Sequence, residues 1–118
     1  MIENLIEIES YLKISFPTDY LNYIENNIGV YENEYNIVDF WSLFQILNME
    51  KKVNYSSTIP NYVVIGTNLS GTALLLNRHD QGIFVTEFIG MDEDYIIKIA
   101  NNFTEFIQKF NNGRIEDF

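Results

Sequence analysis

Few residues of this 118-residue chain have the types and spacing that catalysis requires. The single histidine, His79, stands beside Asp80 in a polar segment, and no Gly-x-Ser-x-Gly sequence accompanies it. A serine hydrolase needs such a base oriented towards a nucleophile. We therefore interpret His79 as a solvated loop residue. The absence of cysteine excludes a thiol nucleophile, a disulfide framework and a thiolate metal site.

Two segments imitate ligand-binding motifs. Gly66–Thr72 has the glycine spacing of a phosphate-binding loop but lacks its lysine, and it links two expected strands where that chemistry needs a helix start. Asp92-Glu93-Asp94 resembles the start of a calcium loop, yet Ile97 stands where that loop needs glycine. We interpret the first segment as a hairpin loop and the three acids as helix caps. The sequence predicts no catalytic residue, cofactor or metal site.

The charge balance narrows the class of partner. Seventeen acids against seven bases give a formal net charge of −10, which phosphate backbones repel, so we expect no direct contact with nucleic acid. A basic protein is the natural complement, although the charge also has a purely solubilising explanation. No apolar run approaches the roughly 18 residues of a membrane span. With no cysteine and no signal-peptide pattern at the N-terminus, we expect a cytoplasmic protein without membrane contact.

The acids are concentrated in two windows without lysine or arginine. The first lies between Lys13 and Lys51, and the second between Arg78 and Lys98. Windows that merge in the fold would form a negative binding face, whereas a charge run is more often only solvated. The lone tryptophan, Trp41, is a core residue in our preferred interpretation and a partner anchor in the other. The residues that we single out as candidates for partner binding are Glu32, Glu34, Asp39, Trp41, Asp92, Glu93 and Asp94.

The elements that position these residues follow from hydrophobic periodicity. The length and the 47% hydrophobic content predict a single domain over residues 1–118. We expect helices at about 2–13 and 18–28, the second started by Thr18 or Asp19 and stopped by Gly29. A strand is expected at 35–40, then a short helix after Ser42 and a polar surface loop over 48–58.

In the second half of the chain the helical spacing of apolar residues gives way to short apolar runs that are typical of strands. Runs at 62–65, 72–76 and 82–88 are joined by short links, so they are expected to be antiparallel strands. A helical apolar stripe follows, with Asp92–Asp94 as its caps and 111–113 as its stop; its members are Ile96, Ile99, Ala100, Phe103, Phe106, Ile107 and Phe110. The sequence thus predicts an α+β fold: a central antiparallel sheet with two N-terminal helices, a short middle helix and a long C-terminal helix packed on it.

Several of these motifs, taken in order, resemble the SUKH superfamily from about Ile2 to Phe110. The resemblance rests on Glu9 in the first helix; Phe16, Pro17, Asp19 and Tyr20 at the second; Asn27-Ile28-Gly29 after it; Trp41, Leu43 and Ile46; Ile65-Gly66 with Gly71; and Ala100, Phe103, Phe106 and Ile107. The chain departs from the family pattern in its split Asn-Gly pair and in Asn77, where an acid is usual. The matching positions are structural and bring no catalytic residues with them.

The resemblance implies a function in binding. SUKH domains are small α+β domains, and many are immunity proteins encoded beside a secreted toxin, often a nuclease. The expected partner is therefore a cognate and basic toxin, bound stoichiometrically and without chemistry by this chain. The alternative is a SUKH adaptor that binds another cellular protein; a hydrolase with acidic catalytic residues has no motif in its favour. The gene neighbourhood separates the first two, and the oligomeric state stays open.

Overall fold

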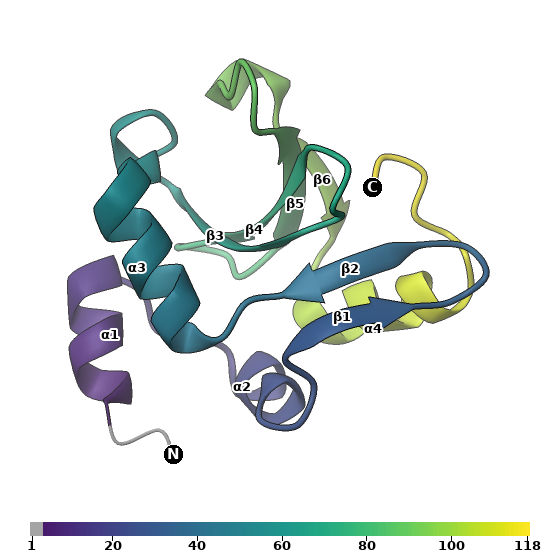
Figure 1. The fold of residues 1–118 in the computed structure, drawn as a ribbon, viewed down its shortest axis with the longest axis horizontal. Coiled ribbons are helices and arrows are strands. Elements are labelled where there is room, and N and C mark those ends of the chain that lie inside the picture. The colour runs from purple at the N-terminus through teal and green to yellow at the C-terminus, as the bar shows by residue number, and fades with distance from the viewer. Residues whose placement is uncertain (1–3) are drawn as a thin grey trace.

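The computed structural model describes residues 4–118, within which four α-helices and six strands alternate with short 3₁₀ turns (Figure 1). In chain order they are α1 (Leu5–Leu12), α2 (Thr18–Ile24), β1 (Gly29–Glu32), β2 (Ile37–Phe40), α3 (Leu43–Val53), η1 (Tyr55–Ser57), β3 (Tyr62–Thr67), β4 (Thr72–Asn77), β5 (Ile83–Glu87), η2 (Glu93–Tyr95), β6 (Ile97–Ala100) and α4 (Phe103–Asn111). No helix in this range is long and apolar enough to cross a bilayer.

All six strands form one antiparallel sheet in which each strand pairs with the next along the chain. Figure 1 shows the β1–β2 hairpin splaying away from β3–β5, to which it is joined through the paired residues Asp39–Thr67 and Phe40–Gly66. This close approach explains Gly66, because a Cβ atom there would overlap the carbonyl oxygen of Asp39. The predicted α+β fold around a central antiparallel sheet is confirmed.

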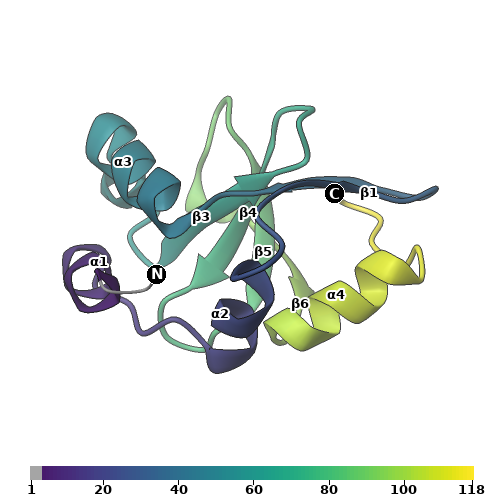
Figure 2. The same ribbon diagram turned by 60° about the horizontal axis from the view of Figure 1, so that its bottom comes forward.

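The helices lie in two groups (Figure 2). One group, α2 and α4, lies on the same side of the sheet, while α1 packs beside α3 near β3. The core under α2 and α4 is aromatic: the ring centroid of Phe103 lies 5.1 Å from that of Tyr20 and 5.9 Å from that of Phe40. Phe106 and Phe110 are also fully buried. Burial of this apolar stripe supplies the main driving force for docking α4.

The prediction for the last helix was partly wrong. Its first expected residues, Ile96–Ala100, lie in the edge strand β6 and its approach, and β6 pairs with β5. The helix starts at Phe103, where the side chain of Asn102 accepts a hydrogen bond from Glu105 N at 2.8 Å. Asp92 caps the 3₁₀ turn η2 by accepting from Asp94 N, so the acids at 92–94 do not cap α4. The C-terminal helix is consequently only nine residues long.

Other boundaries also differ from expectation. Helix α2 ends at Ile24, and Gly29, with φ +100°, opens strand β1, which was not predicted. Helix α3 continues to Val53, so the expected surface loop at 48–58 is largely helical and contains the buried Tyr55. Ser42 caps α3 in a reciprocal capping box with Gln45, as predicted for its start. The expected first helix begins within residues 1–3, which lie outside the described residues.

Candidate protein-interaction surface

The β1–β2 hairpin presents a mixed acidic and apolar face. Its register pairs Val30 with Asp39 and Glu32 with Ile37. Because residues two apart in a strand point to the same side, these four side chains share one face, called here the outer hairpin face. The opposite face carries Val38 and Phe40, both fully buried. Val30 is 60% exposed and Glu32 is also exposed, so the outer hairpin face is available to a partner.

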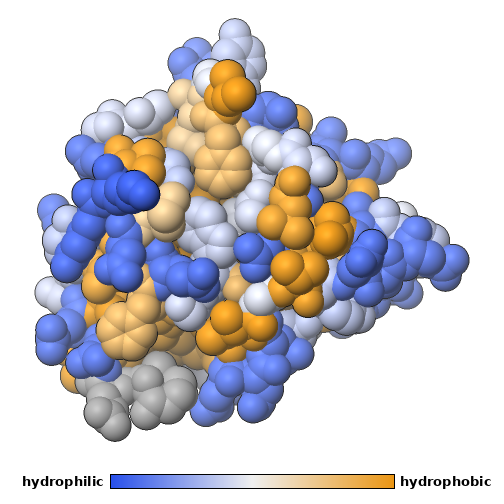
Figure 3. Space-filling model, in the orientation of Figure 1, coloured by the Kyte–Doolittle hydropathy of each residue, from blue (hydrophilic) through white to orange (hydrophobic). Residues whose placement is uncertain are grey.

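The hairpin tip brings two of the predicted acids together. Glu32 and Glu34 both line a groove of about 280 Å³ that runs between the tip and the β3–β4 turn, where Asn68 and Ser70 form the other wall. In Figure 3 the tip is hydrophilic and the base of the hairpin carries apolar surface. The arrangement can accept hydrogen bonds from cationic side chains, since carboxylate oxygens are acceptors only.

The hairpin is held in place by the end of α4. Tyr31 Oη donates to Asn111 Oδ1 at 3.2 Å, and Asn33 Nδ2 donates to the carbonyl oxygen of Phe110 at 3.0 Å. The Tyr35 ring packs on Gly113, where a Cβ atom would lie 2.6 Å from the ring. These contacts fix the hairpin before any partner arrives, which lowers the ordering cost of binding.

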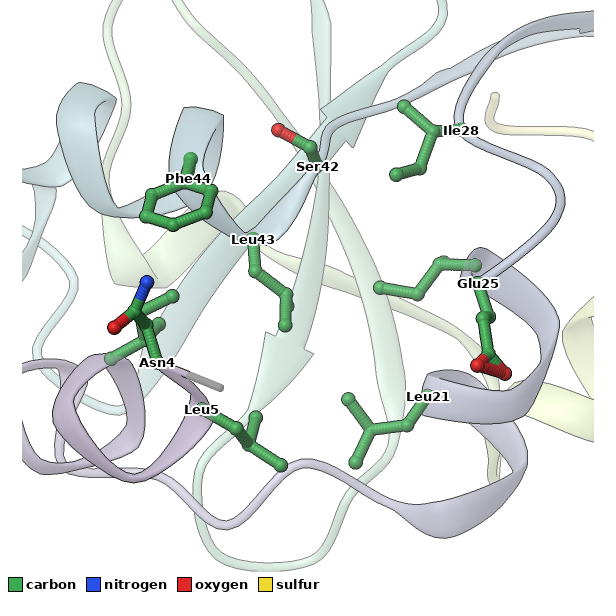
Figure 4. A pocket seen from close by; sticks show the side chains of 10 residues that line it. Asn4, Leu5, Leu21, Glu25, Ile28, Ser42, Leu43 and Phe44 are labelled. Carbon is green, nitrogen blue, oxygen red and sulfur yellow. The ribbon is translucent and has the colours of Figure 1, made fainter. Parts of the chain in front are cut away.

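An apolar pocket of about 210 Å³ opens between α1, α2 and the start of α3. Figure 4 shows Leu5, Leu21 and Leu43 converging on it from these three elements. Ile28 and Phe44 form its rim and are 52% and 51% exposed. Since Ile28 directly precedes β1, the pocket is continuous with the base of the hairpin, and Figure 3 shows apolar surface extending across this region.

The remaining predicted residues lie apart from this surface. Trp41 is 9% exposed and belongs to the hydrophobic core, as our preferred interpretation predicts. Asp92, Glu93 and Asp94 are exposed, but Figures 1 and 2 show their segment and the hairpin tip projecting in different directions. The acids at 92–94 and those at the hairpin tip therefore form two separate acidic projections.

The motifs rejected from the sequence have structural explanations. His79 is exposed and its Nε2 lies 3.0 Å from Asn61 Oδ1. The 66–72 segment contains the turn between β3 and β4. Residues 4–118 contain no group of three His, Cys, Asp or Glu residues placed to hold a metal ion.

Sequence reasoning missed a cleft between the end of α1, the end of α3 and the β4–β5 turn, and this cleft contains the side chains of Glu50 and Arg78. Glu50 is 6% exposed, and its Oε2 accepts from Ser56 N at 3.2 Å and from Ser56 Oγ. Arg78 donates from Nε to Leu12 O at 2.8 Å and from Nη1 to Pro60 O. Burial lowers the pKa of Arg78, while the Glu50 carboxylate acts in the opposite direction. The two side chains pair with backbone groups of Leu12, Ser56 and Pro60, and the polar composition of 48–58 gave no signal of this burial.

Comparison with known proteins identifies one family. The sequence model of the SMI1 / KNR4 family (SUKH-1) matches residues 2–109, which is most of the chain. The match spans the elements from α1 almost to the end of α4, including the β1–β2 hairpin and all walls of the apolar pocket. No curated protein matches the chain significantly.

Proposed function

Since the chain belongs to the SMI1 / KNR4 family (SUKH-1), we propose that it is an immunity protein that binds and neutralises a cognate toxin. The observation that carries this proposal is the family match over residues 2–109. The resemblance to SUKH domains implies this function, because many of them are immunity proteins. The surface is consistent with it: the exposed hairpin and the neighbouring pocket offer charge and apolar area to a protein partner. The site of action would be the cytoplasm of the cell that makes the toxin.

The chemistry of the surface favours a basic toxin, for example a nuclease. The chain has a net charge of −10, and the whole stretch between Lys13 and Lys51, which includes the hairpin, contains no lysine or arginine. A nuclease active site must attract phosphate and is positively charged for that reason. Complementary potentials accelerate association and disfavour wrong partners. The outer hairpin face would occlude such a site as a stoichiometric inhibitor, without chemistry by this chain.

The decisive experiment uses the toxin domain that the proposal expects to be encoded beside this gene. We expect co-expression of this protein to restore the growth of cells that produce the toxin domain. The two purified proteins should form a one-to-one complex, as measured by calorimetry. The double reversal Glu32→Lys/Glu34→Lys should weaken binding at low salt by at least about tenfold, or about 1.4 kcal/mol. Because rim charges act mainly on association, the association rate should carry most of this loss and the difference should shrink in high salt.

The control is a double reversal of equal charge, Glu93→Lys/Asp94→Lys, on the other acidic projection. Each pair changes the formal net charge by +4, so a non-specific effect of charge would affect both variants equally. A toxin that binds neither the wild type nor the variants would contradict the immunity function. Equal loss in both pairs would contradict the assignment of the hairpin as the contact surface.

A further inference from the structure

We propose that the apolar pocket between α1, α2 and α3 is an anchor site that takes one large apolar side chain from a basic segment of the partner. The inference rests on the proposed function and specifies which kind of side chain the partner inserts into this pocket and which charge flanks it. It concerns the pocket lined by Leu5, Leu21, Leu43 and their neighbours, which is distinct from the acidic hairpin tip.

The size of the pocket suits a single side chain. Its volume is about 210 Å³. Apolar cavities of about 150 Å³ hold a benzene-sized molecule, so this pocket has room for one aromatic or branched aliphatic side chain. Seven of its ten lining residues are hydrophobic: Leu5, Ile8, Leu21, Ile24, Ile28, Leu43 and Phe44. Anchors of this kind, buried in a pocket near the centre of an interface, dominate many protein–protein affinities.

Of the three polar lining residues, Asn4, Glu25 and Ser42, the last two require no polar occupant. The hydroxyl of Ser42 accepts from Gln45 N at 3.1 Å, and the amide of Ser42 donates to Gln45 Oε1 at 2.8 Å, so its capping box already uses these groups. The carboxylate of Glu25 points away from the pocket interior in Figure 4. An apolar occupant therefore loses no hydrogen bond to these two residues.

The charge around the pocket specifies the flanks of the occupant. Of the ten lining residues one, Glu25, is acidic and none is basic. Helix α2 ends here, at Ile24, and the partial negative charge of a helix C-terminus favours cations. Ile28 then leads into the outer hairpin face with Asp39 and Glu32. An apolar residue seated in the pocket would therefore have acidic surface on its hairpin side, which lysine or arginine neighbours complement.

The same charge argues against a second copy of this chain as the occupant. Two copies would each bring a net charge of −10, and their base-free stretches between Lys13 and Lys51 would face each other. Like charges brought together at such an interface oppose association at low ionic strength. A heterologous basic partner meets no such repulsion.

The test is an NMR titration of the whole protein, whose leucine methyl groups are isotopically labelled. Two synthetic peptides are added in separate experiments, and each carries a central tryptophan. One peptide has lysine flanks and the other has glutamate flanks. The lysine peptide should shift the methyl signals of Leu5, Leu21 and Leu43 and bind at least about tenfold more tightly than the glutamate peptide or a lysine peptide with central alanine. Ile28→Asp replaces one of the two apolar rim side chains with a carboxylate, so it adds to the attraction for lysine but removes apolar contact, and it should abolish these shifts.

The matched control is Ile97→Asp, because Ile97 on β6 is 46% exposed and does not line the pocket. Equal binding of both tryptophan peptides, or indole binding as tightly as the lysine peptide, would overturn the inference in favour of a small apolar ligand. Dimerisation of the wild type that Ile28→Asp abolishes would overturn it in favour of a second copy. With the toxin itself, unchanged affinity of Ile28→Asp contradicts only the anchor, whereas a wild type that fails to bind contradicts the proposed function.

Discussion

Asp19 joins the start of α2 to the start of α4. Its Oδ2 accepts from the backbone N–H of Thr104 at 3.0 Å and from the Thr104 hydroxyl at 2.7 Å, across 85 residues of sequence. Its Oδ1 accepts from Tyr20 N at 2.8 Å. The Phe-Pro-x-Asp-Tyr motif therefore does more than start a helix, because one carboxylate stabilises two helix N-termini at once.

We expect Asp19→Ala to lower the free energy of unfolding by about 2 kcal/mol, the range for hydrogen bonds to a charged group. Urea denaturation measures the change, and a double-mutant cycle with Thr104→Ala isolates the part that passes through the Thr104 hydroxyl. Asp117→Ala removes an exposed carboxylate and serves as the control. If both aspartate variants unfold at the wild-type midpoint, the link between α2 and α4 contributes nothing.

Phe103 is the centre of the aromatic core, in contact with rings from α2, β2 and α4. Phe103→Ala should destabilise the fold by about 3–5 kcal/mol, because the truncation leaves a cavity among rigid rings. The denaturant midpoint reports the loss. Gln108→Ala, an exposed position on the same helix, should leave it unchanged; equal effects of the two variants would show that Phe103 is not a core residue.

Tyr20 places a hydroxyl in this core without a hydrogen-bond partner among the described residues. An unpaired buried polar group costs about 1–3 kcal/mol, so Tyr20→Phe should stabilise the protein by about 1 kcal/mol. The exposed Tyr11→Phe is the control. Destabilisation by Tyr20→Phe would show that the hydroxyl has a favourable interaction.

The same residue predicts a pH dependence. Burial raises the pKa of Tyr20 far above its ordinary value of 10.0. An unfolded Tyr20 releases its proton near pH 10 while the folded one keeps it, so the folded state binds more protons and stability falls as pH rises above 10. Tyr20→Phe should flatten this decline in thermal melts between pH 9 and 12. Burial also raises the pKa of Tyr23 and Tyr55, so part of the decline should remain.

The purified protein should have no hydrolase activity towards nucleic acid, ester, peptide or nucleotide substrates. His79 faces Asn61, and the buried carboxylate of Glu50 is bonded to Ser56, so the structure assembles no nucleophile–base pair around either residue. Steady-state assays with each substrate class measure this. Turnover that disappears with Glu50→Gln or His79→Ala would contradict the prediction.

Periodicity predicted the elements whose pattern was long or flanked by clear turns. The strands β3, β4 and β5 and the apolar face of α4 were found because their patterns continue over several residues. The edge strands β1 and β6 were missed. The run Ile96–Ala100 has helical spacing by coincidence with the stripe of α4, and only its pairing with β5 and the cap at Asn102 separate the two elements.

The candidate surface was predicted in part. Charge counting singled out Glu32, Glu34 and Asp39, and the structure places two of them in one groove and Asp39 on the outer hairpin face beside Val30. The sequence could not predict the apolar pocket, because each of Leu5, Leu21 and Leu43, taken by itself, has the pattern of an ordinary core-facing helix residue. Their convergence depends on how three helices pack, which no local pattern encodes.

The contacts that hold the β1–β2 hairpin against the end of α4 determine when, during synthesis, the hairpin can take its final position. Tyr31, Asn33 and Tyr35 are fixed by Asn111, Phe110 and Gly113, which follow them in the sequence by 80, 77 and 78 residues and are therefore synthesised much later. When only α1 to β2 have left the ribosome, the residues at the end of α4 that orient the β1–β2 hairpin have not yet been synthesised. The acidic face would thus acquire its final geometry only after α4 has docked, so translation of the C-terminal segment sets the earliest moment at which the protein can engage a partner there.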